Sequence, residues 1–560
     1  MNLTAEVVQT PFWTELSEGT KESTVVGALA GHLEALGVEE AFGVSGGAIA
    51  LFFDQIILSS IELRHFRHES ASAFAAIEAS FATDKPVVVF STTGPGLMNT
   101  LPAMKAAQAD GARIILISGS TGDNQRGRWA TQETSSYTLP SDLLHTPGGA
   151  FDYAVRVEDA GELPEVLRRL QEGLLRPEGF VAHVSIPMAL WNHRLDLPTR
   201  PPHLSSVPSA PAPMGAEMLV DLLALKDKEA EPRFAIWVGH GARGASPQVR
   251  ALAERTGAAV FATPRGKGIF PEKHPRFVGV TGLGGHEEVA QFVKSRALDW
   301  ILVLGSRLGE LSTLWDEALR PRRGLIHVDL DPSVPGSAFP GFPTIGVRAE
   351  IGELLDALLA LCPRTDGDLV PLEAWARTAA SETRSGTTRE QTLINAIQRV
   401  VVEESDAVVM GDGGEITALL NHNLKFSQPR RYRTAPLFAA RGHFCAGVVG
   451  AAIARRGKAV AIVGEEAMAL MAGEVSVAVQ YQAPVVWLVL NRNGHGESYN
   501  QHAALGLSTE HLQLPEVDQV AMARAFGAHG LAVASEEDLD GVLQEAMTLE
   551  GPVVVDVRMA

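Results

Sequence analysis

Short, wholly apolar segments recur along this chain, and each is followed by a stretch long enough to form a helix. Strands that are apolar on both faces are typical of parallel sheets, because helices cover such sheets on each side. The alternation therefore predicts an α/β protein built from doubly wound parallel sheets. The expected strands are residues 41–44, 87–91, 114–118, 181–186, 234–238, 259–262, 300–304, 325–329, 407–410, 459–463, 485–490 and 553–557.

The length of the chain and two breaks in its pattern predict three domains. A single core rarely grows beyond about 250–300 residues, so a chain of 560 residues requires several. Six prolines lie between Pro198 and Pro213, where neither a helix nor a central strand can continue, and a polar stretch surrounds residues 363–371. We expect domains at residues 1–195, 214–362 and 386–560.

Two helices are expected near the starts of these domains. The first should begin after Ser23 or Thr24, which can cap it, and should end at Gly37. The third domain should begin with a helix near residues 390–403.

Charge and cysteine content exclude several classes of protein. With 47 Lys and Arg against 66 Asp and Glu, the formal net charge is −19, which opposes binding to nucleic acid or anionic lipid. Cys362 and Cys445 are far apart and lack metal-ligand spacing, so neither a disulfide framework nor a zinc site is expected. The sequence shows no secretion signal and no apolar run of about 18 residues. We expect a cytoplasmic protein that acts on a small molecule and binds no membrane.

A carboxylate and a glycine-rich turn stand out in the first domain. Glu69, in Arg67-His68-Glu69, opens an expected helix over residues 70–81, and a favourable interaction with the helix N-terminus explains it when it is taken alone. Downstream, the turn Thr93-Gly94-Pro95-Gly96 lies between a buried strand and a helix, where the backbone can approach a ligand closely. Neither feature alone identifies a function.

The order and spacing of these motifs, through residues 79–119 and on to Gln132-Glu133, resemble the pyrimidine-binding domain of thiamine diphosphate (ThDP) enzymes of the acetolactate synthase branch. In that family a glutamate contacts the aminopyrimidine ring and promotes deprotonation of the thiazolium carbon. Glu69 matches this residue, and Gly94 and Gly96 are expected to contact the cofactor. Gln132 matches a side chain that often faces the reaction centre, although a polar loop residue explains it equally well.

The middle of the chain is similar to the central domain of the same family. The likeness rests on residues 263–275, 303–308 and 326–332. Different relatives bind FAD, ADP, coenzyme A or no ligand in this domain, so the resemblance leaves FAD binding open. Gly239-His240-Gly241 is too short to count as a dinucleotide-binding GxGxxG motif, and a structural domain is the default expectation.

The third domain resembles the diphosphate-binding domain but departs from it at both metal-ligand positions. Family members place Gly-Asp-Gly after one strand and an Asn after the next, and the Asp and Asn bind the Mg²⁺ that bridges the diphosphate. Here Gly464-Glu465-Glu466 replaces the first motif, and Arg492 stands 27 residues after Glu465 (492 − 465) in place of the Asn. A carboxylate can still bind Mg²⁺, whereas a guanidinium has no lone pair to offer. Asn493 could replace Arg492 as a ligand after a local shift.

Further residues of the third domain match positions around the cofactor. Gly413 and Glu415 match a turn that faces the diphosphate, and Glu415 would bring another negative charge to it. Phe444 matches the bulky apolar residue that supports the bent cofactor, although a core aromatic is an equally good explanation.

Three arrangements of the altered motif are compatible with these residues. Glu465 could retain a divalent ion together with Asn493 and carbonyl groups. Arg492 could replace the metal and clamp the diphosphate directly. Glu465 and Arg492 could instead pair with each other and close a vestigial pocket. Without compensation, the acidic residues of this region would repel a diphosphate.

The resemblance implies a carboligase or lyase that acts on a 2-oxoacid such as pyruvate and uses ThDP and Mg²⁺. Carboligation is favoured, because the paired histidines that decarboxylases often carry after the Gly-Pro-Gly turn have no counterpart in residues 119–128. One alternative is a homologue whose altered diphosphate site serves other chemistry or ligand binding, and another is a non-catalytic partner of an active homologue. Because the family forms its sites between subunits, a homodimer or homotetramer is expected.

Overall fold

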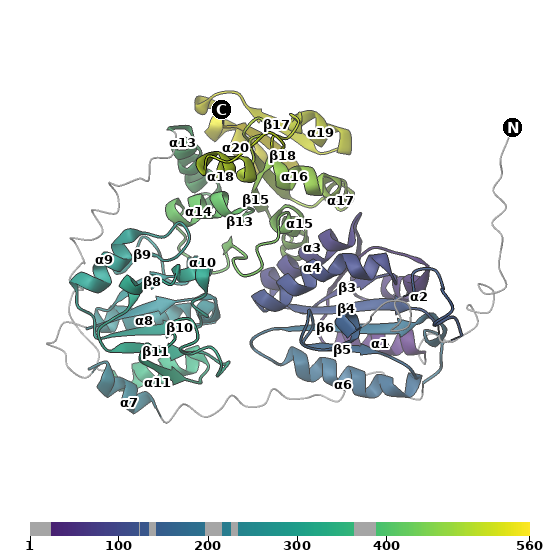
Figure 1. Cartoon of the computed structure of the whole chain (residues 1–560), viewed down its shortest axis with the longest axis horizontal. Helices are drawn as coiled ribbons and strands as arrows, with labels where there is room; N and C mark the ends of the chain where they lie inside the picture. Colours follow the sequence, from purple (N-terminus) through teal and green to yellow (C-terminus); the bar gives the residue numbers. More distant parts are fainter. Residues whose placement is uncertain are drawn as a thin grey trace. The chain divides into compact units, whose positions relative to one another are not determined.

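The computed structural model describes residues 24–122, 124–133, 142–195, 215–225, 233–362 and 388–559. The chain divides into two compact units, residues 1–205 and 206–560. The first unit contains one six-stranded sheet and the second contains two (Figure 1). These three parallel sheets with their surrounding helices confirm the expected fold class. The segments 198–213 and 363–371 lie outside the described residues, so the domain boundaries stay predictions.

The sheet of the first unit has the strand order β2-β1-β3-β4-β6-β5. Helices α1, α2 and α6 pack their apolar residues on one face, and α3 and α4 cover the other (Figure 1). As expected, α1 begins after Thr24, whose hydroxyl accepts the N–H of Gly27 at 3.2 Å. The bounds are α1 Val25–Ala35, β1 Glu40–Gly43, α2 Ala50–Ile57, β2 Glu62–His65, α3 Glu69–Thr83, β3 Val87–Ser91, α4 Pro95–Asp110, β4 Arg113–Ser120, α5 Asp142–His145, β5 Tyr153–Arg156, α6 Leu163–Leu174 and β6 Phe180–Pro187.

The first sheet of the second unit has the order β12-β11-β10-β7-β8-β9. One face packs against α7, α8 and α11, and the other packs against α9. The bounds are α7 Ala216–Leu222, β7 Phe234–Val238, α8 Ser246–Thr256, β8 Ala259–Ala262, β9 Phe277–Val280, α9 Glu287–Ser295, β10 Trp300–Leu304, α10 Glu310–Thr313, β11 Gly324–Val328, β12 Thr344–Val347 and α11 Ile351–Leu361.

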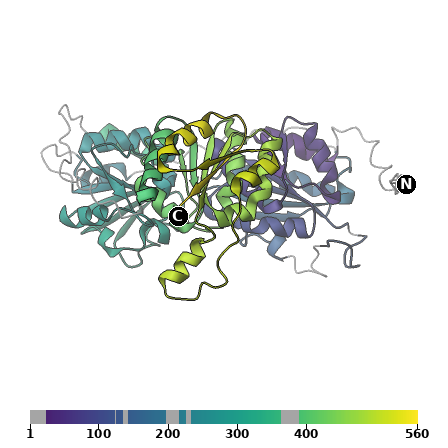
Figure 2. The same cartoon turned by 90° about the horizontal axis from the view of Figure 1, so that it is seen from above.

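The second sheet of this unit has the order β14-β13-β15-β16-β18-β17. Helices α13, α14 and α20 pack against one face, and α18 with the largely exposed loop after it, residues 505–518, extends from the domain (Figure 2). The bounds are α13 Thr388–Ala396, β13 Val408–Gly411, α14 Gly414–Asn423, β14 Tyr432–Arg433, α15 His443–Arg455, β15 Ala459–Gly464, α16 Glu465–Met471, α17 Val475–Gln480, β16 Val485–Asn491, α18 Glu497–Ala504, α19 Gln519–Phe526, β17 His529–Val533, α20 Leu539–Thr548 and β18 Val553–Arg558. The helix expected near 390–403 is α13 followed by a π-helical turn, Ile397–Glu403.

A buried ion pair of the middle domain also contacts the third domain. The Lys267 ammonium donates to the Glu272 carboxylate at 2.7 Å and to the carbonyl of Asn421, near the end of α14, at 3.1 Å. The two charged side chains are 1% and 2% exposed. The hydrogen bond from Lys267 therefore links the middle domain to α14.

The expected strands coincide with the interior strands of all three sheets, within one or two residues at their ends. Among the edge strands, β5, β9, β12, β14 and β17 were not predicted. Within the described ranges, no helix is long and apolar enough to cross a membrane.

Candidate functional site

Two helices of the first unit hold Glu69 in place. Glu69 is the first residue of α3, and the ring of His68 caps this helix by accepting the N–H of Ser70 at 3.1 Å. The side-chain amide of Asn99, on α4, donates to Oε2 of Glu69 at 3.0 Å. The Ser70 hydroxyl in turn donates to the Asn99 carbonyl. Asn99 was not predicted as a site residue, although it lies in the first turns of the helix that follows the Gly-Pro-Gly motif.

The glycine-rich turn lies directly against Glu69 and Gln132. Gly94 has a φ of +66°, and a Cβ at this position would stand 2.6 Å from Cβ of Gln132. A Cβ at Gly96 would stand 3.0 Å from Oε1 of Glu69, so a side chain there would crowd the carboxylate. The Thr93 hydroxyl donates to the Gln132 carbonyl at 3.0 Å. The structure therefore gathers all four residues predicted for this domain.

A second glycine turn, after β1, adjoins the same region and was missed from the sequence. The strand order reverses between β1 and β3, and in open α/β sheets ligands bind where the strand order reverses. A Cβ at Gly43 would lie 2.1 Å from the Phe90 carbonyl oxygen, and one at Gly46 would lie 2.6 Å from Cβ of Thr92. Only glycine allows these two turns to approach so closely.

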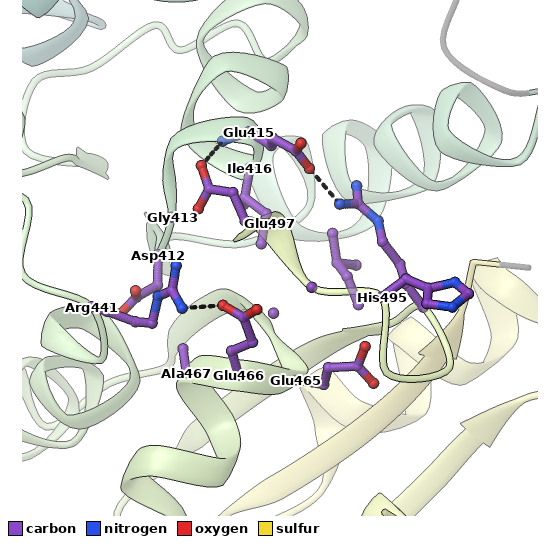
Figure 3. A pocket seen from close by; sticks show the side chains of 14 residues that line it. Asp412, Gly413, Glu415, Ile416, Arg441, Glu465, Glu466, Ala467, His495 and Glu497 are labelled. Atoms are coloured by element: carbon purple, nitrogen blue, oxygen red, sulfur yellow. Dashed lines mark hydrogen bonds and ion pairs between the residues drawn. The ribbon is translucent and has the colours of Figure 1, made fainter. Parts of the chain in front are cut away.

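A cleft in the third domain contains most of the other predicted residues. It opens at the carboxyl ends of β13, β15 and β16, beside the point where the strand order reverses between β13 and β15. The predicted residues in its lining are Gly413, Glu415, Gly464, Glu465, Glu466 and Arg492 (Figure 3). The other lining residues are Asp412, Ile416, Arg441, Ala467, Leu490, His495, Gly496 and Glu497.

Two carboxylates of the cleft occupy helix N-termini, where N–H groups and the helix dipole favour negative charge. Asp412 accepts the N–H groups of Gly442, Phe444 and Cys445 at the start of α15, at 2.8–3.2 Å. Burial raises the pKa of Asp412, and these three N–H groups oppose that rise.

Glu497 is the second of these carboxylates. It accepts the N–H groups of Gly414 and Glu415, each at 3.2 Å, at the start of α14 (Figure 3). Gly413 precedes this helix with a φ of +104°, a conformation that L side chains rarely adopt.

The two arginines of the cleft are paired with carboxylates of the chain. The Arg492 guanidinium contacts Glu415 at 2.6 Å and Glu390, on α13, at 3.4 Å. Arg441 pairs with Glu466 (Figure 3). Arg492 thus pairs with these two carboxylates and not with Glu465, which was the partner considered from the sequence.

Glu465 turns to the loop that follows β16. Its Oε1 atom accepts the N–H of Gly494 at 2.9 Å, and the residue is 7% exposed. Burial raises the pKa of Glu465, and the neighbouring charges of Glu466 and Asp556 raise it further, against hydrogen bonds from the backbone.

Asn493 and Phe444 lie outside the cleft lining. Asn493 is exposed and has a φ of +56°, and its N–H donates to the side chain of Asn491 at 3.0 Å. The Asn491 amide donates to Asp556 at 3.0 Å, so the Asn491 side chain is also hydrogen-bonded within the domain. Phe444 is 3% exposed, and its ring stacks on that of His443 with centroids 4.6 Å apart, a contact typical of a core aromatic.

The cleft residues do not fit the Mg²⁺ that family members hold. Across the described parts of the chain, no three His, Cys, Asp or Glu side chains are placed to hold a metal ion. The Asn ligand is replaced by a cation, and the nearest alternative, Asn493, does not face the cleft. In contrast, the first unit could hold the aminopyrimidine end of the cofactor, because Asn99 holds the Glu69 carboxylate beside Gly94 and Gly96, two residues of the turn that have no side chain.

Models of known protein families match all three parts of the chain. Thiamine pyrophosphate is another name for ThDP, and three models of thiamine pyrophosphate enzymes match the chain in order. They are the N-terminal TPP binding domain at residues 23–139, the central domain at 224–358 and the C-terminal TPP binding domain at 412–557. The chain belongs to the superfamily of ThDP-dependent enzymes.

Relatives of this ThDP-family chain match it along nearly its whole length. The acetolactate synthase of Mycobacterium leprae is 28% identical over 564 residues, covering 94% of this chain and 85% of the relative. The acetolactate synthase large subunit of Haemophilus influenzae is 27% identical and covers 93% and 92%. The solved structure of the Rhodococcus jostii thiamine diphosphate-dependent 4-hydroxybenzoylformate decarboxylase shares the fold, with a TM-score of 0.78, 21% identity and coverage of 96% and 99%.

Proposed function

We propose that this chain decarboxylates a small 2-oxoacid such as pyruvate with ThDP and transfers the remaining unit to a carbonyl acceptor, as acetolactate synthases do. The observation that carries the proposal is the Glu69 carboxylate, held by Asn99 beside the glycine-rich turn. The names of its relatives support acetolactate synthesis, and the absence of paired histidines in residues 119–128 agrees with carboligation.

The residues of the first unit can carry out the proton transfer that this chemistry requires. When bound, ThDP supplies the sink for the electron pair that decarboxylation releases. Glu69 is the group that would hold or release a proton at the aminopyrimidine ring. Asn99 fixes Oε2, while Gly96 keeps the space beside Oε1 free of a side chain. The Thr93 hydroxyl holds the backbone of Gln132, and the Gln132 side chain would line the space beside Glu69.

Replacing Glu69 by Gln tests this proposal. We expect the purified wild-type protein, given ThDP and pyruvate, to release CO₂ and form acetolactate, and Glu69→Gln to abolish both while keeping the circular dichroism spectrum. Glu172→Gln is the matched control, because Glu172 lies on the exposed side of α6, where an ion pair contributes little. Unchanged turnover in Glu69→Gln would show that the carboxylate has no catalytic role.

The acidic cleft favours a second candidate, a homologue in which the diphosphate site serves another ligand. Five carboxylates line the cleft, those of Asp412, Glu415, Glu465, Glu466 and Glu497, against two arginines. Absence of ThDP binding by the wild-type protein, with or without divalent ions, would support this candidate.

We also expect at least a homodimer, because members of this family form their sites between subunits. A sedimentation coefficient that corresponds to a monomer of 59.7 kDa at micromolar concentration would contradict this expectation.

A further inference from the structure

We propose that the cleft at the ends of β13, β15 and β16 binds no divalent metal ion. An arginine stands in place of one metal ligand, and the carboxylates of the cleft are engaged in ion pairs and backbone hydrogen bonds within the chain. The inference deepens the proposed function and rests on it for the identity of the anionic ligand, a diphosphate. The absence of a metal site would distinguish this chain from enzymes that hold their cofactor through Mg²⁺.

The first reason is the cation that stands in place of a ligand. Arg492 follows the last residue of β16, and its side chain is 23% exposed. Contacts with Glu415 and Glu390 hold the guanidinium at the cleft. A guanidinium has no lone pair and keeps its charge, so it both removes a ligand and repels a divalent cation.

The second reason is the direction of the Glu465 carboxylate. In a metal site the loop after β16 would turn an oxygen toward the ion that Glu465 binds. Here the loop turns an N–H toward Glu465, from Gly494 at 2.9 Å, so donor and carboxylate satisfy each other. The Oε1 atom of Glu465 thus has a partner within the chain.

The third reason is that the other carboxylates do not converge. Glu466 pairs with Arg441, while Asp412 and Glu497 accept N–H groups from two different helices, α15 and α14. Each carboxylate therefore has a partner of its own. The acidic residues of the cleft interact with helix N-termini and arginines, and their oxygen atoms do not converge on one point where a metal ion could bind.

The positive charge that a metal would bring must then come from the protein. Arg441 and Arg492 are the two cations of the cleft lining, and a guanidinium can bind phosphate oxygens bidentately. A diphosphate would have to exchange with Glu466 and Glu415 for these guanidinium groups. The structure thus favours the direct clamp over retention of a metal by Glu465 and Asn493.

Electron paramagnetic resonance of Mn²⁺, a substitute for Mg²⁺, tests the inference on the wild-type chain. The signal of free Mn²⁺ falls when the ion binds, so titration into the protein, with and without ThDP, counts bound ions without any assay of activity. We expect no stoichiometric site in either titration. One Mn²⁺ bound per chain at micromolar concentration and displaced by Mg²⁺ would overturn the inference.

The double variant Glu465→Asp/Arg492→Asn restores the ligand types of the family and supplies the opposite test. We expect it to bind Mn²⁺ in the presence of ThDP at least tenfold more tightly than the wild type. Arg323→Asn is the control, because Arg323 is an exposed residue of the middle domain, and it should leave Mn²⁺ binding unchanged. Equal binding by the double variant and the wild type would show that these two residues do not exclude the metal.

The outcomes separate this inference from the proposed function. A chain that neither binds Mn²⁺ nor turns over pyruvate would refute the proposed reaction and leave the metal-free cleft intact. A chain that synthesises acetolactate and binds one Mn²⁺ would refute the metal-free cleft and support the proposed reaction.

Discussion

Replacing Lys267 by Met should strongly destabilise the second unit. Lys267 and Glu272 are almost completely buried, and burial lowers the pKa of Lys267 and raises that of Glu272, while their pairing opposes both shifts. Removing one partner leaves a buried charge without compensation, which costs about 3–5 kcal/mol. For a domain of 150–250 residues, each 1 kcal/mol lost from the free energy of unfolding lowers the midpoint of thermal unfolding by roughly 2–4 °C. The midpoint should therefore fall by about 6–20 °C.

Differential scanning calorimetry of three variants measures this effect. Lys267→Met should lower the unfolding midpoint by the amount above, and Lys267→Met/Glu272→Leu should recover most of the loss, since removing both charges avoids the unpaired group. Lys273→Met is the matched control, because the Lys273–Glu403 pair is also 2.7 Å long but its side chains are 57% and 44% exposed. A Lys267→Met midpoint equal to that of the control, or no recovery in the double variant, would refute the reasoning.

The remaining predictions concern the first unit. Burial lowers the pKa of His183 to about 3, so the unfolded chain gains a proton below about pH 6.5 that the folded chain does not take up. The contribution of His183 to the free energy of unfolding is therefore fully present above about pH 6.5 and is lost as the pH falls toward 3. The free energy of unfolding should fall by about 2 kcal/mol between pH 6.5 and 5. Urea unfolding at both pH values should show this loss, and His183→Gln should reduce it; an equal loss in the variant would contradict the assignment. Asn99→Ala removes a hydrogen bond to a carboxylate, which contributes about 1.5–3 kcal/mol, so kcat/KM for pyruvate should fall by about 10- to 150-fold. Unchanged kcat/KM would show that Asn99 does not position Glu69.

The sequence predicted the interior strands because burial on both faces requires continuous apolar segments. The strands β3 and β15 illustrate this pattern, since nearly all of their residues are buried. The edge strands contact one neighbour and solvent, so their sequences need not be apolar. In β12 no residue is fully buried, and β14 has only two residues, which gives sequence patterns too little to detect.

Candidate site residues could be predicted where a local motif carries them, but their partners could not. Glu415, Glu465 and Arg492 follow strands at recognisable spacings and do line one cleft. Glu390 lies 102 residues from Arg492 in the sequence, and only the packing of α13 brings the two together. Glu497 likewise reaches the start of α14 from a different helix, 83 residues along the chain from Gly414.

The metal dependence of ThDP binding tests the central claim most directly. Isothermal titration calorimetry of the wild-type protein with ThDP would be carried out once in EDTA and once with excess Mg²⁺. We predict one ThDP bound per chain with the same affinity in both titrations, since Arg441 and Arg492 take the place of the ion. Binding that requires Mg²⁺ would contradict the metal-free cleft, and no binding in either titration would contradict the use of ThDP itself.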